Sequence, residues 1–273
     1  MRLFATLYFR DIESGDSHYR LLQKLGYLPE IYFESGWRRL GLKEHKELAA
    51  KVRNELGGCS VHLPYRDLLP GRGEPETLET LKRAAGTAAL YEPVHMVGHA
   101  VFRPLHDSAS APLKHLNMTG KELAGPLWDP NAAFLENSRR VWSGVLAECG
   151  ARLFLENTSE RSPFPLARLL ETLPPERAAM CLDLGHWHHS GMGSAFHNLS
   201  EWISLAAEKI GHLHLHDNDG SADQHLSLGK GLIDFPLLKS LLRQNSLDPS
   251  ATLENQTPED LQESAEYLSR NPF

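Results

Sequence analysis

Strand-like and helix-like segments alternate along the whole chain of 273 residues. Short apolar runs are each followed by a segment with apolar residues at helical spacing. The expected strands are Leu3–Phe9, Glu30–Phe33, Ser60–Leu63, His95–His99, Arg152–Glu156, Ala179–Asp183, Gly211–Leu215 and Ala251–Glu254. The expected helices span 17–26, 43–56, 76–90, 131–149, 164–173, 196–210 and 235–243, and a last helix begins at Pro258 after the N-cap Thr257. Eight such units predict an α/β protein, a (β/α)8 TIM barrel made by residues 1–273 as a single domain.

The rival arrangement for alternating elements is a doubly wound open sheet. Such a sheet normally carries a Gly-rich phosphate turn after its first strand, and residues 10–15 do not form one. The longest irregular stretch spans residues 102–131, follows the fourth expected strand and contains four prolines. We expect it to be an insertion that shapes or covers a substrate pocket.

Composition restricts the setting in which the protein works. No apolar stretch is long enough to cross a bilayer, and residues 1–10 are apolar too briefly for a signal peptide. The three cysteines contain no Cys-x-x-Cys pair, which argues against a disulfide framework and favours the cytoplasm. The net charge of −7 gives no general attraction to nucleic acid, although it allows a local basic groove. The sequence leaves assembly into a homo-oligomer open.

Six of the expected strands end in a residue of the kind that binds metal ions. These residues are His62, His99, Glu156, Asp183, His214 and Glu254. A parallel barrel brings the carboxyl ends of all its strands to one face, so the six side chains are expected to converge there. The 15 histidines are the main anomaly of the composition, and many lie near these strand ends. The pattern indicates a metal-dependent enzyme.

Four of these residues, Glu156, Asp183, His214 and Glu254, offer three carboxylates and one imidazole. That set suits Zn²⁺, Mn²⁺, Mg²⁺ or Co²⁺ and leaves positions for substrate. Any one of them alone could instead cap the following helix, but burying three unpaired carboxylates would be costly.

Two further segments extend the site. A turn after Asp183 is expected to return His186 to the same face. Asp223 and His225 would point the same way if their segment is extended, and the alternative is a polar surface loop.

The segments Leu155–Thr158, Asp183–His186, His214–Asp217, Asp223–His225 and Leu253–Glu254 resemble the xylose isomerase-like TIM barrels. That superfamily contains sugar and sugar-phosphate isomerases and epimerases, and also endonuclease IV (AP endonuclease family 2). The resemblance covers nearly the whole chain in order. It implies a barrel enzyme that binds one to three divalent ions.

Two early motifs resemble endonuclease IV in particular, namely His62-Leu63-Pro64-Tyr65 and the strand-end His99. The resemblance implies three ion sites. His62 and His99 would share one ion with a bridging Glu156. Glu156, Asp183, His214 and Glu254 would hold the second. His186, Asp223 and His225 would hold the third. Tyr65 would match an aromatic residue that contacts DNA.

We predict a metal-dependent isomerase or epimerase of a sugar or sugar phosphate, because the 102–131 insertion and the lack of a basic stripe do not favour DNA. In that chemistry Glu156 and Glu254 move the proton and His186 holds a substrate hydroxyl. Tyr65, His216 and Trp187 would contact the substrate, whereas His212 is expected to pack inside the barrel. The alternative is an endonuclease IV-like zinc phosphodiesterase acting on abasic-site DNA. A lyase or a silent sugar-binding relative stays open, because fold does not fix function.

Overall fold

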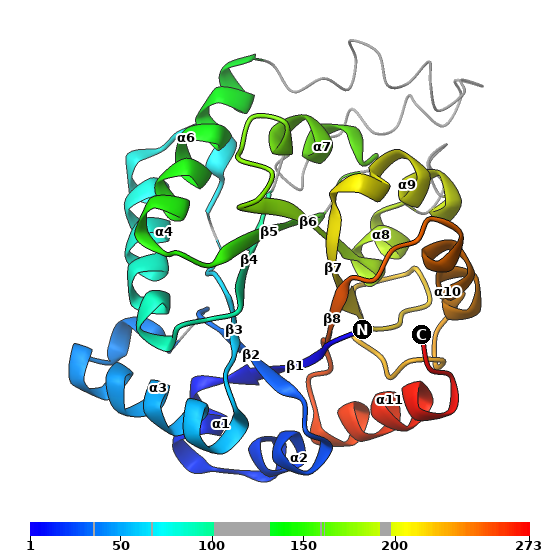
Figure 1. The fold of residues 1–273 in the computed structure, drawn as a ribbon, viewed down its shortest axis with the longest axis horizontal. Coiled ribbons are helices and arrows are strands. Elements are labelled where there is room, and N and C mark those ends of the chain that lie inside the picture. The colour runs from blue at the N-terminus through cyan, green and yellow to red at the C-terminus, as the bar shows by residue number, and fades with distance from the viewer. Residues whose placement is uncertain (35, 67, 101–131, 159, 161, 192–197) are drawn as a thin grey trace.

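The computed structural model describes the chain apart from residues 35, 67, 101–131, 159, 161 and 192–197. Eight parallel strands close into a barrel, in which each strand pairs with the next and β1 pairs with β8 (Figure 1). The strands are β1 Leu3–Tyr8, β2 Leu28–Tyr32, β3 Ser60–His62, β4 His95–His99, β5 Arg152–Glu156, β6 Ala178–Asp183, β7 Ile210–Leu215 and β8 Ser250–Leu253. The predicted (β/α)8 barrel is confirmed, and closure excludes the open sheet.

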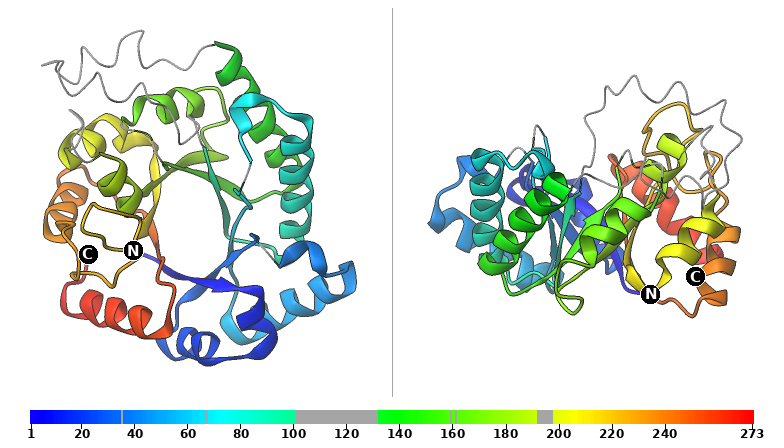
Figure 2. Two further views of the ribbon diagram at one scale, coloured as in Figure 1. Left: turned by 180° about the vertical axis from the view of Figure 1, so that it is seen from behind. Right: turned by 90° about the horizontal axis from the view of Figure 1, so that it is seen from above.

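Helices surround the barrel on its outside, as the views in Figure 2 show. They are α1 Phe9–Ser14, α2 Ser17–Leu25, α3 Leu42–Leu56, α4 Pro75–Ala88, α6 Ala132–Glu148, α7 Phe164–Leu170, α8 Leu184–Gly191, α9 Leu199–Ala206, α10 Phe235–Gln244 and α11 Pro258–Arg270. As predicted, Thr257 caps α11, since its side chain accepts a hydrogen bond from the Asp260 amide. The helix expected over 196–210 is shorter. A 3-10 turn at Ala207–Lys209 follows α9, and β7 already begins at Ile210.

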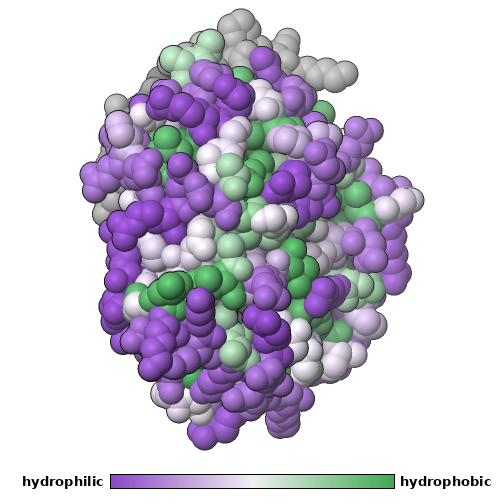
Figure 3. Space-filling view, turned by 60° about the vertical axis from the view of Figure 1, so that its left-hand side comes forward, coloured by the Kyte–Doolittle hydropathy of each residue, from purple (hydrophilic) through white to green (hydrophobic). Residues whose placement is uncertain are grey.

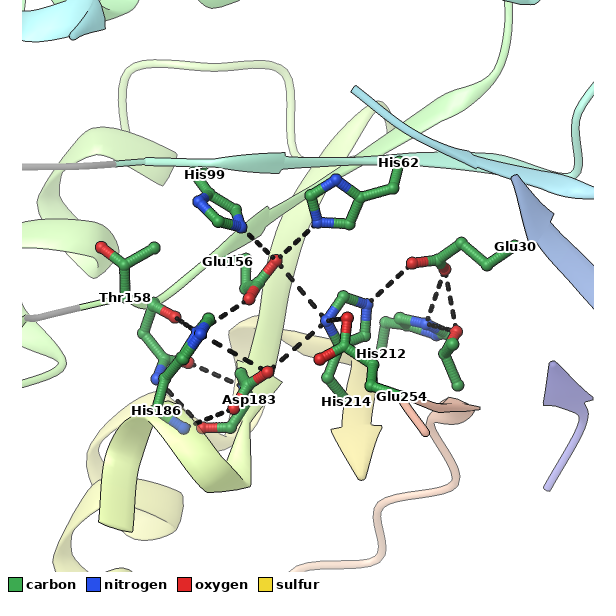
Figure 4. Close-up of polar contacts among 12 residues, drawn as sticks. Glu30, His62, His99, Glu156, Thr158, Asp183, His186, His212, His214 and Glu254 are labelled. Carbon is green, nitrogen blue, oxygen red and sulfur yellow. Dashed lines mark hydrogen bonds and ion pairs between the residues drawn. The ribbon is translucent and has the colours of Figure 1, made fainter. Parts of the chain in front are cut away.

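The hydrophobic core lies between the strands and the helices. Trp142 of α6 and Trp202 of α9 are its largest fully buried side chains. Along β7, Leu213 and Leu215 belong to this outer core, while His212 and His214 alternate with them and point into the barrel (Figure 4). Strand periodicity therefore separates an apolar outer layer from a polar barrel interior.

The outer surface is mostly hydrophilic. Figure 3 shows the side of the molecule that carries the left-hand helices of Figure 1, where hydrophobic residues appear in separate patches among polar ones. Within the described ranges, no helix combines the length and apolarity needed to cross a membrane. The insertion predicted at 102–131 lies outside the described residues.

Gly98 of β4 is packed against the outer core, so it provides a test of how closely α6 approaches the barrel. A Cβ added at Gly98 would lie 2.7 Å from the Trp142 ring, whereas one added at Gly150 would meet nothing within 4 Å. We expect Gly98→Ala to lower the free energy of unfolding by about 1–3 kcal/mol through overpacking. The matched change Gly150→Ala should alter it by less than about 0.5 kcal/mol. Urea unfolding of both variants checks this, and equal losses would contradict the packing described.

Candidate metal centre

Nine side chains predicted as metal ligands lie together at or beside the carboxyl ends of the strands, and Figure 4 labels those other than Asp223 and His225. Each has a nitrogen or oxygen within 3.6 Å of a counterpart atom of another member. They are His62, His99, Glu156, Asp183, His186, His214, Asp223, His225 and Glu254. Their side chains fall into three sets that meet at Glu156.

The first set joins β3, β4 and β5. His62 Nε2 lies 3.0 Å and His99 Nε2 3.3 Å from the same carboxylate oxygen, Glu156 Oε2. Tyr65 stacks on the His99 ring at a centroid distance of 4.1 Å. The three ligand atoms are close enough together to surround one cation.

The second set surrounds one nitrogen of β7. His214 Nδ1 lies 2.9 Å from Glu254 Oε1, 3.5 Å from Glu156 Oε2 and 3.6 Å from Asp183 Oδ2. Three buried atoms here, His214 Nδ1, Asp183 Oδ2 and Glu156 Oε1, have no hydrogen-bond partner in the described part of the chain. Buried polar atoms are normally satisfied, so such a group indicates a missing ligand.

The third set lies beside α8 and the loop after β7. Asp223 Oδ2 is 3.2 Å from His225 Nε2 and 3.4 Å from His186 Nε2. The condition that this segment be extended is not met, because His225 has a φ of 50°, in the left-handed region. This turn brings His225 back to Asp223. It also stacks the ring on His216 at a centroid distance of 3.9 Å.

His216 was predicted to contact substrate, and the structure places it among the possible ligands. Its Nε2 lies 3.3 Å from Asp183 Oδ1 and 3.7 Å from Asp223 Oδ1. Gly185 makes room for it, since a Cβ there would lie 1.8 Å from the His216 ring. The glycine of the Asp183–His186 segment is therefore required by packing.

Three of the histidines are held in the same way. The Nδ1 atoms of His62, His186 and His225 lie 2.8–3.0 Å from the backbone oxygens of Leu63, Asn157 and Glu254. A carbonyl only accepts, so Nδ1 carries the proton and Nε2 keeps its lone pair for a ligand. Metal-binding histidines are usually oriented in this manner.

The centre is strongly acidic. Glu156, Asp183 and Glu254 are buried, and among the described residues no lysine or arginine lies within 4.0 Å of their carboxylates. Burial raises the pKa of Asp183, but His186 and His216 outweigh it and hold the pKa well below its usual value. Burial likewise raises the pKa of Glu156, and His99 and His214 reverse the shift. Without a metal ion, protonated histidines such as His186 and His214 supply the positive charge that these carboxylates need, since the carboxylates raise the pKa of both imidazoles despite their burial.

Two residues of the centre were not predicted. Glu30 of β2 lies 3.1 Å from His214 Nε2, measured to its Oε1. Tyr32 stacks on His62 at a centroid distance of 4.3 Å, and its hydroxyl donates to Glu254. Both residues belong to an expected strand, and their period-two spacing is the signal that could have placed them on the inner face.

The predictions for Trp187 and His212 have different outcomes. Trp187 is only 7% exposed and belongs to the hydrophobic core, so its position does not favour the predicted contact with substrate. His212 packs inside the barrel between Phe154 and Phe4, as predicted.

The donor set fits divalent ions. It combines carboxylate oxygens with imidazole nitrogens that have free lone pairs, and three buried donor atoms lack partners. The first set would hold one ion, the residues around His214 a second, and Asp223 with its histidines a third. Glu156 belongs to the first two sets and approaches the third through His186.

Relatives of the chain are known from sequence. An uncharacterised protein of Methanocaldococcus jannaschii, MJ1311, is 28% identical over 222 residues, which are 76% of this chain and 68% of that protein. Another from the same organism, MJ1614, is 29% identical over 123 residues, and the match spans 45% of its length.

Solved structures share the fold over nearly the whole chain. The TTHB071 protein of Thermus thermophilus, soaked with zinc chloride, is 26% identical with a TM-score of 0.68, and the match covers 100% of this chain and 98% of that one. A D-tagatose 3-epimerase-like protein is 22% identical with a TM-score of 0.69, covering 99% and 96%. Endonuclease IV of Thermus thermophilus is 18% identical with a TM-score of 0.63, covering 99% and 100%.

A family described as xylose isomerase-like TIM barrel matches residues 25–271. This match extends over most of the chain, and the closed barrel agrees with it. The chain belongs to the xylose isomerase-like TIM barrel family.

Proposed function

We propose that this protein is a metal-dependent hydrolase that cleaves a phosphodiester with the help of neighbouring divalent ions. The observation that carries the proposal is the sharing of Glu156. Its Oε2 lies within 3.5 Å of nitrogens of His62, His99 and His214, and its Oε1 is a buried atom without a hydrogen-bond partner in the described part of the chain. A carboxylate placed in this way can serve two ions at once.

The ligand set is larger than isomerase chemistry needs. One ion held by Glu156, Asp183, His214 and Glu254 would suffice to polarise a sugar carbonyl. His62, His99, Asp223 and His225 would then be surplus, although they are arranged as ligands. Several neighbouring ions supply an activated water and neutralise the attacking and leaving oxygens of a phosphoryl group.

The protein's own side chains hold this arrangement in place. Backbone carbonyls fix His62, His186 and His225. Tyr32 donates to Glu254 and so orients that carboxylate. Burial and the Glu254 carboxylate raise the pKa of the Tyr32 hydroxyl well above its usual value, so the phenol stays protonated.

The charge of the protein supports a small substrate. A groove that binds duplex DNA is expected to be cationic, and the chain carries a net charge of −7. We therefore favour a small phosphodiester over abasic-site DNA. Zinc is the first ion to test, because the donor set is rich in imidazole and the TTHB071 protein was soaked with zinc chloride.

Sugar isomerisation or epimerisation is the second candidate, and one observation favours it. Glu156 and Glu254 approach His214 Nδ1 from separate strand ends, at 3.5 and 2.9 Å. Two carboxylates beside one ion suit removal and return of a proton on a sugar or sugar phosphate.

A first prediction concerns activity. Purified protein loaded with zinc or manganese should hydrolyse bis(p-nitrophenyl) phosphate, and Glu156→Gln should lower kcat by about 10³-fold or more, as expected when a group essential to the site is lost. His189→Ala, an exposed histidine beside the site, should keep the wild-type rate. Incorporation of deuterium from D₂O into a ketose, without any phosphodiester cleavage, would instead favour the isomerase.

A second prediction concerns metal content. Replacing Asp223 and His225 together by alanine removes two ligands of the third set only. Elemental analysis should show about one ion fewer per chain than in the wild type, while the other sets keep theirs. An unchanged content would mean that Asp223 and His225 do not bind an ion, and His189→Ala again serves as the control.

A third prediction concerns pH. Burial lowers the pKa of His225, but the Asp223 and Glu254 carboxylates outweigh it and raise the pKa from 6.5 to about 9. In protein stripped of metal, this raised pKa contributes stability that is complete below pH 6.5 and is lost as pH rises through about 9. The free energy of unfolding after chelation should therefore fall across this range, and less so in His225→Ala. Zinc should remove the dependence, since the ion replaces the proton.

A further inference from the structure

A column of polar side chains runs down the barrel axis beneath the metal centre. Glu30 lies in its middle, with an exposed fraction of 0%. Its partners are side chains of β3, β4, β7 and β8, and all of them are buried or nearly so: Ser60, His95, His212, His214 and Thr252. The interior of such a barrel is usually filled by branched apolar residues, so this column is unusual.

The direction of each hydrogen bond in the column follows from which atoms can donate. Thr252 Oγ1 donates to Glu30 Oε2 at 2.8 Å. Because the single hydroxyl hydrogen of Thr252 takes part in that bond, Thr252 Oγ1 must accept in its contact with His212 Nε2, at 2.9 Å. His212 therefore carries its proton on Nε2, and its Nδ1 accepts from Ser250 Oγ at 2.7 Å.

This order leaves one oxygen of Glu30 for His214. Oε2 accepts from both Thr252 and Ser60, the latter at 3.2 Å. Oε1 lies 3.1 Å from His214 Nε2, and neither atom makes a hydrogen bond in the described part of the chain, so each is left for the other. Because a carboxylate only accepts, pairing of these two atoms requires that a neutral His214 carry its proton on Nε2. Its Nδ1 lone pair then faces Glu156, Asp183 and Glu254 (Figure 4).

We propose that Glu30 is a positioning residue, which fixes the tautomer and the ring orientation of His214 for the second ion. The column from Ser250 to Thr252 keeps Glu30 itself in place. His214 differs in this respect from His62, His186 and His225, which are held by backbone oxygens and bind through Nε2. The inference rests on the metal centre of the proposed function and not on the reaction that the centre performs.

The charge of Glu30 explains why the chain keeps such a column. A buried carboxylate without a cation is costly, and among the described residues the basic side chains within 4.0 Å of Glu30 are all histidines. A divalent ion on the far side of His214 would polarise the imidazole and draw its Nε2 proton toward Glu30. Charge on Glu30 therefore strengthens the ligand, as outer carboxylates do in metal sites.

The test is metal affinity in Glu30→Gln, which keeps the size of the side chain and removes its charge. In competition with a chelator, Co²⁺ should bind the second site about 10–100-fold more weakly than in the wild type, while the remaining sites keep their affinity. The visible Co²⁺ bands assigned to that site should be lost at limiting metal. The His214→Ala variant identifies those bands.

Asp11→Asn is the matched control. Asp11 is another buried carboxylate, which accepts from the Tyr8 amide and pairs with Arg10. Removing its charge should affect folding stability without changing Co²⁺ affinity. Equal affinities in Glu30→Gln and the wild type would overturn the proposal, and so would equal losses in Glu30→Gln and Asp11→Asn.

A measurement on the wild type does not depend on whether a variant folds. Nitrogen-15 NMR of the zinc-loaded protein should show His214 protonated on Nε2 and bound through Nδ1. Protonation on Nδ1 would overturn the proposal. None of these readouts needs turnover, so a failure to cleave phosphodiesters would refute the proposed function and leave the role of Glu30 to be judged separately.

Discussion

Negative charge buried at one end of the barrel is the constraint on which the rest of the site depends. Closure of the sheet brings Glu156, Asp183 and Glu254 within reach of one imidazole nitrogen, His214 Nδ1. The described residues place no lysine or arginine within 4.0 Å of them. Histidines are their neighbours instead, and a neutral histidine is itself a ligand. The positive charge therefore comes from protonated histidines or, as we propose, from divalent ions that would take the place of those protons.

Orientation of the histidines is the second requirement, and the fold meets it in two ways. At the rim, where loops begin, backbone oxygens of Leu63, Asn157 and Glu254 hold Nδ1 and leave Nε2 for the ion. Deeper in the barrel the backbone of β7 pairs with β6 and β8, so we propose that a side chain orients His214 instead. Glu30 takes that position beneath His214. On this proposal His214 would bind an ion through Nδ1, whereas His62, His186 and His225 would bind through Nε2.

Much of the site could be predicted because each strand-end ligand directly follows an apolar run, and strand ends share one face of a barrel. His62, His99, Glu156 and His214 were placed by that argument alone. Glu30 was not, because it lies within a strand, where a polar residue gives no local sign of facing the axis. The geometry of Asp223 and His225 was also missed, since a left-handed residue other than glycine is not visible in the pattern. Trp187 was expected to contact substrate because it lies near a strand end, yet helix α8 places it in the core.

The sequence by itself determined the alternation of strands and helices, and with it the closed barrel and the rim where ligands gather. Period-two and helical spacing are local properties, so they can be read without knowing which segments meet. Only the tertiary structure decided which atoms face one another: that Glu156 lies between His62 and His99 and also faces His214, that His216 joins Asp223, and that Glu30 supports His214. Those contacts join residues far apart in the chain. Their distances depend on strand register and on the packing of the barrel interior, which no single segment encodes.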